Sequence, residues 1–145
     1  MSGITLALLL IQAFNMEKTK QYLSIIRALV FISIALAILI LSLVPQPPEI
    51  ITDFELSDKI MHLIAYITLA FSMGFILPSS FSTIRTILSV VIISSLYGAL
   101  IEFLQGFTGR TPEGLDLVFD TIGAAIGIFL YFVLKDIEYK YHKKR

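Results

Sequence analysis

The stretch DKIMH, residues 58–62, brings a carboxylate, an amine and an imidazole together at the start of a long apolar run. Asp58 and His62 are four residues apart, so in a helix they lie on one face, and Lys59 precedes His62 by three. Side chains of these types can bind a polar ligand or exchange protons with one. They can also hold a divalent cation when further carboxylates converge on them.

A second set of polar residues occurs later in the chain, around the junction of two further apolar runs. Its members are Glu102, Gln105, Arg110, Glu113, Asp116 and Asp120. Asp116 and Asp120 are one turn apart and share a helix face. Arg110 is the expected partner of at least one carboxylate, because its planar fork can bind one bidentately. We expect both sets to meet at a single level of the protein.

The composition indicates which solvent surrounds these residues. Hydrophobic residues make up 57% of the 145-residue chain and charged residues 15%, with a mean hydropathy of +0.87. Ordinary soluble domains carry about 25% charged residues. A small core cannot bury this much apolar side chain, so we predict a bilayer protein. A net charge of zero gives no indication of nucleic-acid binding, and the absence of cysteine excludes thiolate chemistry.

Four segments are long enough to cross the hydrocarbon layer, which needs about 20 apolar residues. They are residues 22–44, 59–77, 85–104 and 115–134. Prolines follow the first two, and a glycine-containing loop follows the third. Backbone polar groups in lipid must be paired within the segment, so these segments should be helices. The predicted fold is all-α: a polytopic bundle of four transmembrane helices in the cell membrane.

The distribution of basic residues predicts the topology. Eight Lys or Arg lie at one end of the predicted spans: in the amino-terminal flank, at Arg85 after the 78–84 loop, and in the carboxy-terminal tail. Only two, Lys59 and Arg110, lie at the opposite end. Basic residues in short loops stay on the cytoplasmic side. Both termini should therefore be cytoplasmic, and the DKIMH end should face outward.

The predicted organisation is one membrane domain, residues 22–134, between a flank, 1–21, and a basic cytoplasmic tail, 135–145. Residues 1–15 are apolar but short for a span, and they lack the features of a signal peptide. They are interpreted as an over-extended start or as an interfacial or re-entrant segment. Gly123 and Gly127 form a GxxxG pattern, for which we favour packing within the chain over dimerisation. The oligomeric state stays open.

Several of the polar residues also have simple structural interpretations. Asp58 and Asp116 lie at predicted helix starts, where a carboxylate can cap free N–H groups. Lys59 can extend to the lipid headgroups, and His62 can be a hydrogen-bonded packing residue. Glu102 is harder to explain in this way, because the carboxyl end of a helix disfavours negative charge. Pairing with Arg110 is its best structural explanation.

The two polar blocks resemble those of the VanZ-like family. DKIMHLIAY is similar to the D-K-x-x-H-x-x-x-Y signature that opens the family's second span. IEFLQGFTGRTPEGLDLVFDTIGAAIG is similar to its second block, with the matching residues Glu102, Gln105, Arg110, Asp116 and Gly123. The resemblance covers residues 22–134 and implies a bacterial membrane protein of four spans. Its namesake is associated with resistance to the glycopeptide teicoplanin, and the family implies no established reaction.

One position departs from the family pattern. Asp120 stands where the family often has Asn, and an ionised carboxylate cannot donate the hydrogen bond that an amide can. Protonation of Asp120, or its pairing with Lys59 or Arg110, would compensate for the change.

Two functional hypotheses remain open. The first is an envelope accessory protein that binds a lipid headgroup, a cell-wall precursor or a glycopeptide through Asp58, Lys59, His62, Glu102, Gln105, Arg110, Asp116 and Asp120. The second is a membrane enzyme for a lipid-linked substrate, with His62 or Glu102 as base and Arg110 stabilising negative charge. No nucleophile, cofactor or metal motif of firm spacing is present. Asp58, His62, Glu102 and Asp116 could hold a divalent cation only if the helices converge.

Overall fold

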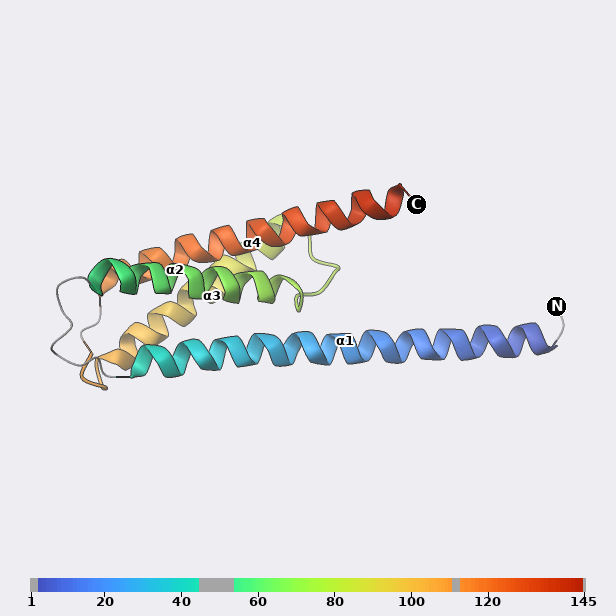
Figure 1. Ribbon diagram of the computed structural model, residues 1–145, viewed down its shortest axis with the longest axis horizontal. Helices are drawn as coiled ribbons and strands as arrows, with labels where there is room; N and C mark the ends of the chain where they lie inside the picture. Colours follow the sequence, from blue (N-terminus) through green and yellow to red (C-terminus); the bar gives the residue numbers. More distant parts are fainter. Residues whose placement is uncertain (1–2, 45–53, 111–112, 145) are drawn as a thin grey trace.

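The computed structural model describes residues 3–44, 54–110 and 113–144, with side chains from residue 12 in the first helix and residue 58 in the second. The described residues form helices and turns, without strands. The helices are α1 (Gly3–Leu43), α2 (Phe54–Gly74), α3 (Thr83–Gln105) and α4 (Gly114–Lys143). Connections run at alternate ends, so α1 and α3 finish at the end where α2 and α4 begin (Figure 1).

Large apolar side chains face outward on all four helices, as is normal for a protein surrounded by lipid. Among the described residues, three helical stretches are long and apolar enough to cross a membrane: Gln12–Leu43, Thr83–Gln105 and Gly114–Lys143. α2 is not among them. Three of the four predicted spans therefore agree with the structure, and the crossing by α2 stays a prediction.

Close packing of α2 against α4 forms the centre of the bundle. A Cβ placed on Gly123 would lie 2.6 Å from the carbonyl oxygen of Leu63, and one on Gly127 would overlap that of Ile67. The two glycines thus let the helix backbones approach directly, which is the use of small residues between membrane helices. Buried Ala70 and Ala124 continue the interface away from the polar end.

α1 lies along one side of the bundle, and its amino-terminal part extends beyond the other helices (Figure 1). Ile38 joins Tyr66, Leu69 and Ile101 in a buried apolar cluster. The Tyr97 hydroxyl donates to the carbonyl of Ala35 at 2.6 Å. These contacts attach the last third of α1 to α2 and α3.

Several helix boundaries differ from the predicted ones. α1 is continuous from Gly3, so the predicted flank and first span form one helix, because no proline or glycine interrupts residues 4–43. α2 ends at Gly74, three residues before the predicted limit, and tight turns lead from it to Pro78. α4 continues through the predicted tail, where Lys135–Glu138 and Asp136–Lys140 pairs support its last turns. The proline-rich segment 45–48 lies outside the described residues.

Candidate functional site

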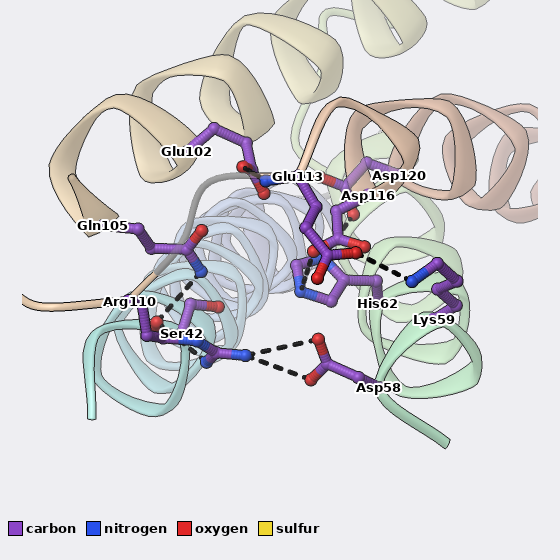
Figure 2. A network of polar contacts seen from close by, with 10 residues as sticks. All are labelled: Ser42, Asp58, Lys59, His62, Glu102, Gln105, Arg110, Glu113, Asp116 and Asp120. Carbon is purple, nitrogen blue, oxygen red and sulfur yellow. Dashed lines mark hydrogen bonds and ion pairs between the residues drawn. The ribbon is translucent and has the colours of Figure 1, made fainter. Parts of the chain in front are cut away.

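Charged and polar side chains meet at the end of the bundle where α1 and α3 finish and α2 and α4 begin (Figure 2). We call this set the polar cluster. It comprises Asp58, Lys59, His62, Glu102, Gln105, Arg110, Glu113, Asp116 and Asp120, together with the main-chain carbonyl of Ser42. All eight polar residues singled out from the sequence are in it. Their convergence follows from the antiparallel course of consecutive helices.

The imidazole of His62 lies at the buried centre of the cluster, held between two carboxylates of α4. Its Nδ1 is 2.9 Å from Oδ1 of Asp120, and its Nε2 is 3.6 Å from Oδ2 of Asp116. The three side chains are 7%, 1% and 4% exposed. Spacings of four residues on each helix, Asp58 to His62 and Asp116 to Asp120, turn these groups toward one another.

Arg110 connects the loop after α3 to two other helices. Its Nη2 donates to Oδ1 and Oδ2 of Asp58 at 3.1 and 3.3 Å, and its Nη1 donates to the Ser42 carbonyl at 3.0 Å. The buried amide of Gln105 donates to the same carbonyl at 3.1 Å. Carbonyls in the last turn of a helix have no partner within it, so these two donors complete the end of α1.

Glu113 joins the remaining parts of the cluster. Its side chain forms an ion pair with Lys59, 2.9 Å from Nζ to Oε2. Its main-chain N–H donates to Oε2 of Glu102 at 2.7 Å, which ties the end of α3 to the start of α4. Glu102 is therefore bound to a backbone donor, whereas its expected structural partner, Arg110, lies against Asp58. Pairing across the loop depends on the loop's path, which helical periodicity does not describe.

The expected capping roles of Asp58 and Asp116 are not what the structure shows. α2 begins at Phe54, so Asp58 lies beyond its first turn, in contact with Arg110. Glu113 occupies the N-cap position of α4, and Asp116 lies in the first turn with its side chain buried. A carboxylate there still meets the positive end of the helix dipole.

Asp120 also has a different partner from the two expected. Lys59 and Arg110 are bound by Glu113 and Asp58, and Asp120 contacts His62. The phenol of Tyr66, one turn further along α2 than His62, is fully buried beside Asp120. Gly98 of α3 makes room for both, since a Cβ there would lie 2.5 Å from Oδ2 of Asp120 and 3.2 Å from the Tyr66 hydroxyl.

Sequence reasoning missed Tyr66, Gly98 and Ser42 as parts of this site. Tyr66 carried a signal, because it follows His62 by four residues and so lies on the same helix face. Gly98 and Ser42 carried none, because one acts through the absence of a side chain and the other through its main-chain carbonyl. The place of Glu113 in a loop does not predict its contacts with both Lys59 and Glu102.

Some buried polar atoms of this region have no hydrogen-bond partner in the described residues. They are Oε1 of Glu102, Oδ1 of Asp116, the Tyr66 hydroxyl and the Ser94 hydroxyl. Burial of a polar group without a partner costs free energy, so native proteins pair almost all of them. The first two atoms belong to the polar cluster and offer acceptors to a donor or a cation.

Fold and site together define a class of protein: an all-helical membrane protein with apolar outer surfaces and a buried polar cluster at one end. The sequence model of the family VanZ/LLP1 matches residues 4–135. The chain belongs to this family. No curated protein and no solved structure matches it significantly.

Proposed function

We propose that this protein is a multi-pass protein of the cell membrane whose polar cluster binds the polar headgroup of a lipid or a lipid-linked cell-wall precursor. The observation that carries the proposal is the convergence of mixed-sign side chains from three helices and a loop, with buried acceptors on Glu102 and Asp116 lacking partners. Charged groups in a membrane protein are expensive and generally mark functional sites. A lipid reaches such a site from the bilayer with its headgroup at the level of the helix ends.

The orientation proposed for this protein turns the polar cluster outward and leaves both termini in the cytoplasm. α2 then serves as the fourth span, packed against α4. The excess of Lys and Arg at the opposite end of the helices supports this orientation. Outward exposure gives the cluster access to envelope precursors, which supports an accessory role in the cell envelope.

Glycopeptide resistance is the narrower form of this proposal, taken from the family's namesake. It rests on analogy within a family, which does not by itself transfer a function. Its test is the teicoplanin susceptibility of a bacterial strain that expresses the protein, compared with the same strain carrying an empty vector. Equal susceptibility would remove resistance from the proposal and leave headgroup binding to be judged separately.

Binding is tested by native mass spectrometry of the purified full chain with the lipids that accompany it. Glu102→Ala and Arg110→Ala should each lose a bound lipid that the wild type retains, when equal amounts of purified folded protein are compared. Lys135→Ala is the matched control, because its exposed ion pair with Glu138 lies on α4 outside the polar cluster. Identical lipid profiles for all four proteins would end the proposal.

An enzyme acting on a lipid-linked substrate is the second candidate, and one contact favours it. His62 has one ring nitrogen held by a buried carboxylate, as in bases whose orientation a third group maintains. Lipid mass spectrometry of cells that express wild type or His62→Ala tests this role. A substrate should accumulate with the variant, whereas indistinguishable lipid compositions would argue for binding without turnover.

A further inference from the structure

The polar cluster contains more acids than its bases can neutralise. Five carboxylates, those of Asp58, Glu102, Glu113, Asp116 and Asp120, meet two permanently charged bases, Lys59 and Arg110. Both bases are engaged in ion pairs, Lys59 with Glu113 and Arg110 with Asp58. Among the described residues, Asp116 and Asp120 contact the imidazole of His62, and Glu102 accepts a hydrogen bond from the main-chain N–H of Glu113. Such a set attracts a cation in preference to an anion.

Asp116 is the carboxylate for which this excess matters most. Its residue is 3% exposed, and its Oδ1 is a buried atom without a hydrogen-bond partner in the structure. Among the described residues, its Oδ2 makes a long contact, 3.6 Å, with Nε2 of His62. Burying a charge is costly unless it is paired or coordinates a metal. Asp116 therefore offers a buried carboxylate oxygen to a cation beside His62.

Asp58, His62 and Asp116 have the geometry that such a partner needs. Each offers one ligand atom, and the three atoms lie within 4.8 Å of one another. Two donors at about 2.1 Å from a tetrahedral ion lie about 3.4 Å apart, close to the separation of the His62 and Asp116 donors. For a tetrahedral site the Asp58 donor, at the edge of the cluster, must come closer to the other two than the 4.8 Å within which the three now lie.

The neighbouring residues already hold these donors in the way that metal ligands are held. Asp120 contacts Nδ1 of His62, which leaves Nε2 directed at Asp116. A ligating histidine nearly always has its other nitrogen bound to a carboxylate, carbonyl or water, and ligating carboxylates are themselves hydrogen-bonded. Arg110 provides such a hydrogen bond to the carboxylate of Asp58.

We propose that Asp58, His62 and Asp116 bind one divalent transition-metal ion, with Asp120 positioning the imidazole. One imidazole and two carboxylates suit Zn²⁺ and Mn²⁺, which accept mixed nitrogen and oxygen ligands. α2 supplies two ligands and α4 the third, and the contact of Gly123 with the α2 backbone sets their spacing. The ion adds a positive charge through which the cluster can bind an anionic headgroup. Metal binding itself needs no lipid, so it is tested separately from the proposed function.

The first experiment measures metal affinity on the untagged full chain in detergent, after treatment with a chelator. Titration with Mn²⁺ followed by electron paramagnetic resonance should show one saturable site per chain, from which Zn²⁺ displaces Mn²⁺. Asp116→Asn, nearly isosteric, should weaken binding by at least about tenfold. Asp136→Asn is the matched control on the same helix, exposed and outside the cluster. Absence of a saturable site in the wild type, or equal affinity in both variants, would overturn the proposal.

The second experiment identifies the ligand directly, starting from the wild-type protein. Pulsed electron paramagnetic resonance of the Mn²⁺-loaded wild type should show coupling to an imidazole nitrogen. The chain has two histidines, and the other, His142, is exposed near the end of α4. His142→Gln should therefore keep the nitrogen coupling, and His62→Gln should lose it. A signal without nitrogen coupling, or one that disappears with His142→Gln, would contradict a site at His62.

Discussion

The Nδ1 atom of His62 lies 2.9 Å from Oδ1 of Asp120, so the central imidazole of the polar cluster is held across the interface of α2 and α4. Both residues are almost completely buried. The contact links the first polar block of the sequence to the second over a separation of 58 positions. It also makes the orientation of His62 sensitive to the residue at position 120.

Two replacements of Asp120 should show whether its negative charge or its hydrogen-bond acceptor is what supports metal binding at His62. Asp120→Asn keeps an oxygen that accepts from the imidazole, so His62 stays oriented and the metal affinity falls only slightly. Asp120→Ala removes the acceptor, and the affinity for Mn²⁺ should fall about 10- to 100-fold. The measurement is the Mn²⁺ titration described above. Equal losses in the two variants would mean that the charge of Asp120, and not its acceptor, is what matters.

Arg110→Ala should destabilise the end of the bundle. The change leaves Asp58 without this partner and removes one of two donors to the Ser42 carbonyl. We expect the free energy of unfolding to fall by about 2–3 kcal/mol, because hydrogen bonds to charged groups are stronger than neutral ones. Denaturation in mixed detergent micelles, followed by circular dichroism, measures the change. Lys140→Ala, which breaks an exposed pair with Asp136, should cost less than about 0.5 kcal/mol.

Gly127→Ala should disturb the contact between α2 and α4. The added methyl group would overlap the main-chain carbonyl of Ile67, so the helices must move apart. Overpacking of this kind costs about 1–3 kcal/mol, and the same unfolding measurement detects it. Gly114→Ala serves as the control, because nothing lies within 4 Å of the added atom. Similar effects at both positions would show that the close approach of α4 to α2 is not required for stability.

The proposed topology predicts which loops a membrane-impermeant reagent can reach. The chain contains no cysteine, so single cysteines can be introduced without removing any. Phe107→Cys, at an exposed position after α3, should react with an impermeant maleimide in intact cells. Ser80→Cys, at an exposed position in the α2–α3 loop, should react only after permeabilisation. The reverse pattern would invert the orientation, and labelling of both in intact cells would exclude a crossing by α3.

The residues of the polar cluster could be predicted from the sequence because the prediction needs only features within one helix or one short connection. Long apolar runs predict helices, since lipid leaves no other way to pair the backbone. Spacings of four residues put Asp58 with His62 and Asp116 with Asp120 on common faces. Short connections make consecutive helices antiparallel, which brings both polar blocks to the same end of the bundle.

The pairing of these residues was decided only by the tertiary structure. Arg110 binds Asp58 and the end of α1, Glu102 binds a main-chain N–H, and Asp120 binds His62. Which acid meets which base depends on the axial position and rotation of each helix, to within a few ångströms. Direct contact of Gly123 and Gly127 with the α2 backbone sets those values between α2 and α4. Residue spacing within one helix carries no information about its position against another, so the partners of Asp116 and His62 emerged only when the helices were packed.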